Sequence, residues 1–509
     1  MRSPGSTSKD TRWIRKSVWD AACAFRSAPP TPSGWWAHYR TGGAKGRPLN
    51  DEESLRGLPA VHELLDVIRE QRPESLPSFT KKACRHVLDE ERKRIRSGKS
   101  PRKRKALDEA VISRLDAIEL HSMERVINAT GVVLHTAIGR ACLPPPASEA
   151  VSRTAEGYCV LQWNRETGRR GHRDEHIEDL LIELTGAEAA TVVNNNAGAT
   201  FLILSALCRG REVVVSRGQL VEIGGAFRIP EVMKQSGAVM REVGCTNRTH
   251  LRDYEEAICE ETAALLRVHP SNYRIRGFTG EVSLEALVDL GNRTGLPVID
   301  DLGAGSLVDL NHFGLPTEPT VSHSIEVGAS LTTSSGDKLI GGPQAGIITG
   351  KKELVEKIKR HPLARALRVG KLTLSGLQST LRLFLEDPEY LIEHHPVYSM
   401  LGADSDELEE RRKTLLSDLE LPPDCEAQPI ETDSYVGSGS LPDTPIPSLG
   451  VGITAPDVDE LARLLRLGAP AVASRVEEGM LKLDVRTVFS EQIPELARLV
   501  SLVAGGLWG

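Results

Sequence analysis

One lysine stands apart through its surroundings: Lys338, in "SSGDKLIGGPQAG" (334–346). It follows an acid and precedes a Gly-Gly-Pro turn, and an apolar-leaning run lies on either side of the motif. A lysine that is crowded at a strand end loses its proton easily and becomes a nucleophile. The pattern fits a lysine that forms a Schiff base and equally one that grips a phosphate, so other motifs must decide between them.

The first of these motifs is "VVNNNAGAT" (192–200), in which an apolar run ends in asparagines and a helical pattern then starts with small residues. A helix N-terminus binds phosphate through its free N–H groups and its dipole. Asn195 and Asn196 can donate or cap, and the small residues Ala197 and Gly198 let a phosphate approach the backbone. Runs of asparagine are also ordinary caps and turns, so this motif alone does not establish a phosphate site.

The second motif is "PVIDDLGAGSL" (297–307), an apolar strand that ends in Asp300 and Asp301. An acid at a buried strand end can hold a protonated ring nitrogen, although a metal site or a capped loop would look the same. Lys338 follows Asp301 by 37 residues. A phosphate cradle, a strand-end aspartate and a lysine in this order suggest pyridoxal phosphate, with the lysine as Schiff base and the aspartate on the pyridine nitrogen. The sequence has neither a P-loop nor a dinucleotide-binding glycine motif.

The elements that must position these motifs alternate between short apolar runs and helical patterns from Val126 to about Leu385. We predict strands at 189–194, 211–216, 238–243, 264–269, 297–301, 330–335 and 345–349. Such alternation is typical of a largely parallel sheet covered by helices on both faces, with ligands beyond the carboxyl ends of the strands. We therefore predict an α/β catalytic domain at 126–385 and a smaller α/β domain at 386–509.

The N-terminal quarter differs from the rest of the chain in composition and in hydrophobic pattern. Residues 1–52 are rich in Pro, Gly, Ser and Arg, which favours a disordered extension. Three helical patterns follow and define a predicted helical module at 53–125. Within it, "RKRIRSGKSPRKRK" (92–105) carries nine basic residues in fourteen, on a chain of net charge −7. This basic block is either a solvated helix end and linker or a surface that neutralises nucleic-acid phosphates.

The overall composition indicates a globular protein: 40% of the 509 residues are hydrophobic. The eight cysteines form no C-x-x-C pair, which argues against a zinc site, so we predict no metal. No apolar run reaches the length of about 18 residues that a membrane span needs, and no secretory signal is recognisable. We predict a cytoplasmic enzyme with reduced thiols.

Several long motifs together resemble the bacterial selenocysteine synthases, the L-seryl-tRNA(Sec) selenium transferases. They are "RVINATGVVLHTAIGRA" (125–141), "LTGAEAATVVNNNAGA" (184–199), "SRGQLVEIGGAFRIPEVMKQSGA" (216–238), "VHPSNYRIRGFTGEVSLEAL" (268–287), "DLGAGSLVDL" (301–310), "SGDKLIGGPQAGIITGKKELVEKIKRHPLARALRV" (335–369) and "DVRTVFSEQ" (484–492). The resemblance runs from about Leu55 to the C-terminus, and it is loose in the helical module.

The resemblance implies an aspartate-aminotransferase-like, fold type I pyridoxal phosphate enzyme with Lys338 as the Schiff-base lysine. It implies that Asn195, Asn196 and Ala197 hold the cofactor phosphate. It also favours Asp301 over Asp300 as the aspartate of the cofactor ring.

The same resemblance assigns the selenium donor. Arg140, Arg365 and Arg368 match the arginines that bind the oxyanion of the donor, and arginine forks suit phosphate oxygens. Asp337 is expected to orient Lys338 or an arginine. The chain departs from the family at Ala137, where an asparagine is usual, and at Gly370, where an aspartate is common.

The implied reaction converts L-seryl-tRNA(Sec) to L-selenocysteinyl-tRNA(Sec) with selenophosphate, through an aminoacrylyl-tRNA intermediate. The family implies a homo-oligomer, a ring-shaped decamer, and the helical module would bind the tRNA. Two alternatives remain open from the residues: a pyridoxal phosphate enzyme acting on a free amino acid, and a tRNA-binding protein without catalysis. The first has no need for the basic block, and the second predicts no bound chromophore.

Overall fold

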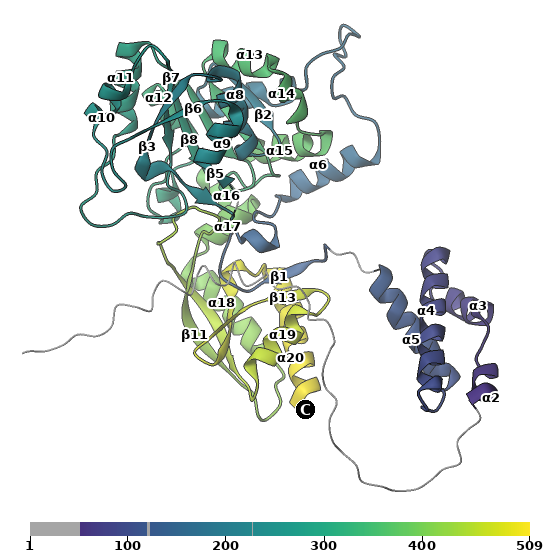
Figure 1. Ribbon diagram of the computed structural model, residues 1–509. Coiled ribbons are helices and arrows are strands. Elements are labelled where there is room, and N and C mark those ends of the chain that lie inside the picture. Colours follow the sequence, from purple (N-terminus) through teal and green to yellow (C-terminus); the bar gives the residue numbers. More distant parts are fainter. Residues whose placement is uncertain (1–50, 120–122, 226, 509) are drawn as a thin grey trace, which may run out of the picture. The chain divides into compact units, whose positions relative to one another are not determined.

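The computed structural model describes residues 51–119, 123–225 and 227–508, and its packing divides the chain into two compact units, with the division between Arg125 and Val126 (Figure 1). Each unit is described by itself. The predicted disordered extension, 1–52, lies outside the described residues except for Asp51 and Glu52, which begin the first helix.

The N-terminal unit is a small bundle of helices. Its elements are α2 (Asp51–Arg56), α3 (Val61–Gln71), α4 (Pro77–Arg96) and α5 (Arg104–Glu119). The three longer helices match the three helical patterns of the sequence. Their apolar stripes meet in one core that includes Leu64, Ile68, Val87, Leu88, Val111 and Leu115. Proline begins α4, where the missing N–H group has no partner to lose.

The C-terminal unit is built on a seven-stranded sheet with the strand order β2-β10-β9-β8-β7-β3-β6. The strands are β2 (Ala189–Val193), β3 (Glu212–Ser216), β6 (Val239–Val243), β7 (Thr262–Val268), β8 (Val298–Gly303), β9 (Leu331–Ser335) and β10 (Gly346–Gly350). All seven strands predicted from the sequence are present. Only β10 runs antiparallel to its neighbours in this sheet.

Helices cover both faces of this sheet, as the continuous apolar strands predicted (Figure 1). Val213 and Val215 of β3 join one hydrophobic cluster, and Val214 joins another, because successive side chains of a strand point to opposite faces. The first cluster is closed by α8 (Asn196–Leu207), α9 (Ile229–Ser236) and α13 (Lys352–Arg360). The second is closed by α10 (Leu251–Ala257) and α11 (Leu284–Thr294), and α12 (Val321–Val327) contacts α11 and β9.

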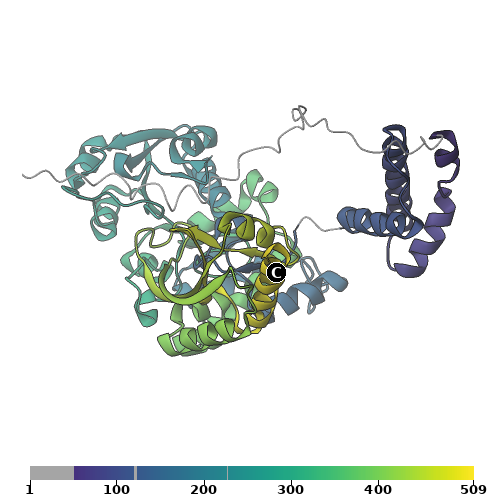
Figure 2. The same ribbon diagram turned by 90° about the horizontal axis from the view of Figure 1, so that it is seen from below.

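A second, antiparallel sheet with the order β11-β12-β15-β14 lies in the C-terminal part of the chain. Its strands are β11 (Glu426–Ser434), β12 (Ile446–Thr454), β14 (Arg475–Glu477) and β15 (Met480–Asp484). The helices α18 (Ser405–Asp418), α19 (Val458–Arg466) and α20 (Ile493–Trp508) pack with it, and Figure 2 shows these elements grouped together.

Two segments pack across the predicted limits between the catalytic domain and the small domain. The short strand β1 (Val126–Asn128) pairs with β13 (Ala471–Ala473), so the start of the predicted catalytic domain joins the core of the small one. Conversely, α16 (Pro388–His394) and α17 (Pro396–Gly402) pack into the core beside the large sheet. Both exchanges are long-range contacts, which local patterns do not report. No helix among the described residues is long and apolar enough to cross a membrane.

Candidate active site

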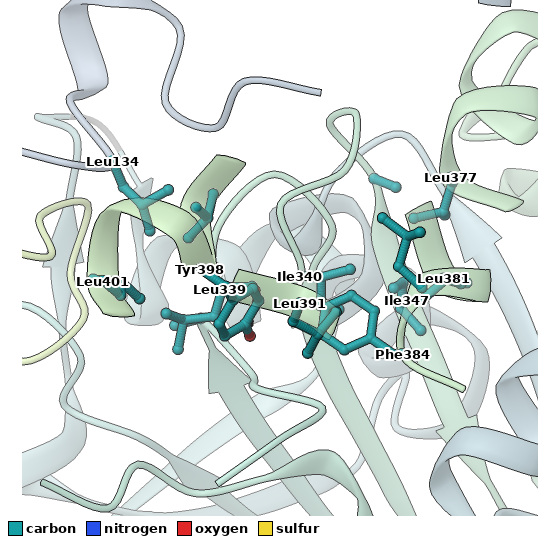
Figure 3. Packing of buried hydrophobic residues seen from close by; sticks show 14 of the residues in the cluster. Leu134, Leu339, Ile340, Ile347, Leu377, Leu381, Phe384, Leu391, Tyr398 and Leu401 are labelled. Atoms are coloured by element: carbon teal, nitrogen blue, oxygen red, sulfur yellow. Dashed lines mark hydrogen bonds between the residues drawn. The ribbon is translucent and has the colours of Figure 1, made fainter. Parts of the chain in front are cut away.

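The turn that carries Lys338 is anchored by the two residues that follow it. Leu339 and Ile340 are fully buried in the hydrophobic cluster drawn in Figure 3. The Tyr398 hydroxyl donates to the carbonyl of Leu339 at 2.8 Å, and His395 Nε2 lies 3.1 Å from the carbonyl of Ile340. These buried contacts fix the backbone on the C-terminal side of the lysine.

Glycine is required just beyond this anchor. Gly341 has φ +67°, in the left-handed region, and a Cβ there would lie 2.0 Å from Cε1 of His395. The Gly-Gly-Pro turn therefore lets the chain pass close to His395, between α16 and α17. The same turn holds the lysine just beyond the end of β9.

Lys338 is only 7% exposed. Burial lowers the pKa of its ammonium group, and the nearby Arg140 cation lowers it further, while Asp337 and Asp301 oppose both effects. The neutral amine is therefore more accessible than in an exposed lysine. A crowded lysine at a strand end is what the sequence predicted here.

Asp301 is held by donors from three elements. Its carboxylate accepts hydrogen bonds from Asn196 Nδ2 (2.8 Å), Thr200 Oγ1 (2.9 Å) and Thr333 Oγ1 (2.9 Å). The N–H group of Gly303 adds a fourth contact at 3.1 Å. The carboxylate is thus fixed between the start of α8 and strand β9.

Asp300 points to the opposite face of the sheet. It pairs with Arg267 at 2.8 Å and accepts from the Ser324 hydroxyl at 2.8 Å, and burial raises the pKa of its carboxyl. The alternation of side chains along β8 separates the two acids. The structure thus brings Asp301, and not Asp300, together with Asn196.

The first turn of α8 forms a cradle beside Asp301. Asn195 caps the helix by accepting from the N–H group of Gly198 at 2.8 Å. Asn196 Oδ1 is buried without a hydrogen-bond partner. A Cβ on Gly346 would lie 2.2 Å from the Asn195 carbonyl, so strand β10 can only approach this turn as glycine. Ala197 lies half-buried in the same turn.

Arg140 and Asp337 form an ion pair next to the lysine. Arg140 Nη1 lies 2.5 Å from Asp337 Oδ2, and Gln344 Nε2 approaches the same oxygen at 3.5 Å. Arg140 adopts φ +64°, a conformation that costs a non-glycine residue about 1 kcal/mol or more. These three side chains line a hollow together with Thr136, Gly139, Ala141, Leu143, Gly342 and Pro343.

Arg365 and Arg368 lie on another segment of the chain. Arg365 is on α14 (Pro362–Ala366) and Arg368 follows this helix, and both side chains are exposed. The N–H group of Asn194 donates to the Leu367 carbonyl at 2.8 Å, and Val193 bridges to Arg368, so this segment lies against the end of β2. In the described chain no hydrogen bond or ion pair joins either arginine to Lys338 or Arg140. Their convergence on one anion stays a prediction.

His269 was not singled out from the sequence. It is 8% exposed at the carboxyl end of β7. Its backbone N–H group donates to the backbone carbonyl of Asp301 at 2.8 Å. Burial lowers the pKa of its imidazole to about 4, and the cations of Arg267, Arg274 and Lys338 add to the effect. The sequence held a usable signal, because His269 ends a predicted strand just as the other site residues do. Among the described residues, no group of His, Cys, Asp and Glu is arranged to hold a metal ion.

Known proteins match this chain over the stretch that contains these site residues. The model of the L-seryl-tRNA selenium transferase family matches residues 126–489, which include both sheets and every site residue above. The chain belongs to this family. A selenium transferase of Aquifex aeolicus is 45% identical over 450 residues, covering 87% of this chain and 97% of the relative. One from Moorella thermoacetica is 46% identical over 476 residues, covering 91% and 99%.

The alignments with these two selenium transferases are longer than the stretch from Val126 to Gly509, so they extend into the N-terminal unit. Among solved structures, D-glucosaminate-6-phosphate ammonia-lyase has a TM-score of 0.52 at 20% identity and covers 77% of this chain and 98% of its own. This likeness concerns the fold. The predicted aspartate-aminotransferase-like, fold type I architecture is confirmed.

Proposed function

We propose that this protein converts L-seryl-tRNA(Sec) to L-selenocysteinyl-tRNA(Sec), with selenophosphate as the selenium donor and pyridoxal phosphate as the cofactor. The observation that carries the proposal is the buried Lys338, which follows Asp337 of the Arg140–Asp337 pair, together with an Asp301 that is fixed by the start of α8. Membership of the selenium transferase family supports the choice of substrates.

The side chains fit pyridoxal phosphate. Asn195, Asn196 and Ala197 would hold the phosphate at the free N–H groups in the first turn of α8. Asp301 would accept a hydrogen bond from the ring nitrogen, and Lys338 would carry the cofactor. Bound there, pyridoxal phosphate supplies an electron-withdrawing ring that stabilises negative charge on the α-carbon of the seryl group.

The residues of the chain itself do the proton chemistry. Lys338, whose pKa is lowered by burial and by Arg140, accepts the proton of the substrate α-carbon as a general base. Asp337 pairs with Arg140 and limits its freedom. Arg140, Arg365 and Arg368 bind the donor oxyanion, each with a guanidinium fork that matches two oxygens.

The helical module offers a surface for the tRNA. Of the nine basic residues in the basic block, Arg92, Arg94, Arg102, Arg104 and Lys105 are ion-paired with carboxylates. Within the described residues the other four, Lys93, Arg96, Lys99 and Lys103, have no partner, and all four are exposed. These four free cations are available to phosphates.

The pairing within the basic block has a structural core. Glu91 is fully buried in side chain and lies 3.4 Å from Arg94 Nε and 3.5 Å from Arg102 Nε, and it accepts from the N–H group of Arg102 at 2.7 Å. It thereby ties the end of α4 to the start of α5. The remaining cations are displayed around a fixed connection.

We further propose a cytoplasmic homo-oligomer, decameric by family resemblance. Light scattering of the purified chain would measure its mass.

The test is turnover by the full-length protein, with seryl-tRNA(Sec) and selenophosphate as substrates and selenocysteinyl-tRNA(Sec) as the measured product. Lys338→Ala should abolish turnover and also the lysine-linked cofactor absorbance, and borohydride should no longer attach cofactor mass to the peptide around residue 338. Lys357→Ala, an exposed lysine on α13, serves as the control and should change neither. Retained activity in the Lys338 variant, or equal turnover of free serine by the intact protein, would contradict the proposal.

A further inference from the structure

A cluster of four arginines lies around α14 and the residues that follow it. Arg365 and Arg368 belong to this segment, and Arg170 and Arg173 come from the stretch just before α7 (Glu178–Thr185). Only Arg365 and Arg368 have a role in the proposed function. The other two arginines raise the question of why two more cations are placed here.

Arg173 is tied to the backbone next to Arg368. Its Nη1 donates to the carbonyl of Val369 at 2.5 Å, and its Nη2 donates to Gln162 Oε1 at 3.2 Å. Gln162 in turn accepts the N–H group of Gly171 through its backbone carbonyl at 3.1 Å. The half-buried Arg173 therefore joins the Arg368 segment to the turn that bears Arg170.

The four cations are poorly neutralised. Burial lowers the pKa of Arg173, and the charges of Arg368, Arg170 and Arg365 lower it further, with Asp174 alone acting against them. Asp174 is shared, because Thr191 donates to it at 3.2 Å and Lys359 acts on its charge.

Some exposed arginines elsewhere in the described chain have an acidic partner, as Arg293 has Glu255 at 2.8 Å. In the part of the chain that the structure describes, Arg170, Arg365 and Arg368 have no such partner, and all three side chains are exposed. Like charges held together without a counter-charge repel one another, and an anion bound among them would remove that cost.

We propose that Arg170 and Arg173 complete, with Arg365 and Arg368, a binding site for a compact phosphate-type oxyanion that carries more than one negative charge. Arg170 contacts the anion directly. Arg173 is a positioning residue, since both of its hydrogen bonds go to the protein and one of them fixes the chain beside Arg368. The inference rests on the proposed function, in which the free selenium donor is such an anion, and it deepens the account of the donor site.

Arg170→Gln, Arg173→Gln and Arg173→Lys, each in the full-length protein, test the inference. Titration calorimetry with inorganic phosphate as the probe measures the anion site directly, and the KM for selenophosphate and the Kd for seryl-tRNA(Sec) are measured beside it. Both glutamine variants should weaken phosphate binding and raise the KM roughly tenfold or more, because each removes a charge at the site. Arg173→Lys keeps the charge but loses the two-pronged contact, so its loss should be intermediate.

Arg293→Gln on α11 removes the same charge from a residue that is paired with Glu255, and it should leave phosphate binding, KM and Kd unchanged. The cofactor absorbance and the affinity for seryl-tRNA(Sec) should also be unchanged in all three cluster variants. The Arg170 side chain makes no hydrogen bond or ion pair in the described structure, so its variant tests the site even where a change at Arg173 disturbs folding.

Unchanged phosphate affinity in Arg170→Gln and Arg173→Lys would overturn the inference. So would a loss of seryl-tRNA(Sec) affinity with phosphate binding intact, which would assign the cluster to a phosphate of the RNA. A protein that binds phosphate through these arginines and yet transfers no selenium would leave the anion site standing and refute the proposed function.

Discussion

The four unpaired cations of the basic block allow a quantitative prediction about tRNA binding. The variant Lys93→Gln, Arg96→Gln, Lys99→Gln and Lys103→Gln removes the cations that are free to meet phosphates and leaves the five ion pairs of the block intact. All four side chains are exposed, so the helical bundle should keep its fold. The expected effect is electrostatic and therefore depends on salt.

The size of the effect follows from counterion release. Each phosphate that a cation neutralises adds about 0.7–0.9 to the slope of log affinity against log salt. If all four cations contact phosphates, the variant should lose roughly 2.8–3.6 from this slope. Between 50 and 200 mM salt, the affinity of the intact protein should then fall about 50- to 150-fold more than that of the variant.

The assay is the Kd for seryl-tRNA(Sec) across that salt range, measured on the full-length protein by filter binding or anisotropy. The matched control is Lys81→Gln, Lys82→Gln, Arg85→Gln and Arg114→Gln, which removes the same charge from exposed residues of α4 and α5 outside the block. The control should keep most of the slope. Equal slopes in the intact protein and the block variant would refute the reasoning, and equal losses in both variants would show that net charge, rather than the block, attracts the tRNA.

Three further expectations concern single sites. Asp301→Asn should abolish turnover in a folded protein, whereas Asp300→Asn should chiefly lower thermal stability, because Asp300 faces Arg267 on the other side of the sheet. Measurements of turnover and of melting temperature distinguish the two variants. The reverse result would contradict the assignment of Asp301 to the site. Arg365→Ala or Arg368→Ala should slow selenium transfer about ten- to hundredfold and spare dehydration of the seryl group, measured as separate steps; equal loss of both would argue against a donor-specific role. Glu91→Gln should destabilise the helical module by about 3 kcal/mol, because two arginines lose a buried partner. Hydrogen exchange of α4 and α5 in the full chain measures the loss of stability. Unchanged protection of these two helices would refute the prediction.

Strand positions and the order of the motifs could be predicted from the sequence because both are local. Apolar runs of five or six residues are typical of strands in an α/β chain, and the residue that ends a parallel strand lies at the ligand edge of the sheet. His269 obeys the same rule and could have been found by it. The choice between Asp300 and Asp301, in contrast, needed either the resemblance or the structure, since either acid can face the ligand until the register of β8 is known.

The basic block shows what local patterns do not contain. Its nine cations look alike in the sequence, and the structure separates them because Glu91 is buried between α4 and α5 and binds two of them. A buried carboxylate is revealed only by the packing of two helices against each other. The pairing of β1 with a strand far along the chain is likewise absent from local patterns.

The arginines of the donor site extend this argument to chemistry. Arg140 is committed to Asp337 at 2.5 Å, so an anion that engages it must share the guanidinium with a carboxylate. Arg365 and Arg368 carry no such commitment among the described residues, and Arg173 holds their segment in place. Anion capture should therefore depend most on the unpaired arginines, because they gain a counter-charge without losing one. Arg140 also acts on the lysine, since its charge helps to lower the pKa of Lys338. We therefore expect the three arginines, which the motifs present as equivalent, to contribute unequally to anion binding, and the difference lies in which of them already has an acidic partner.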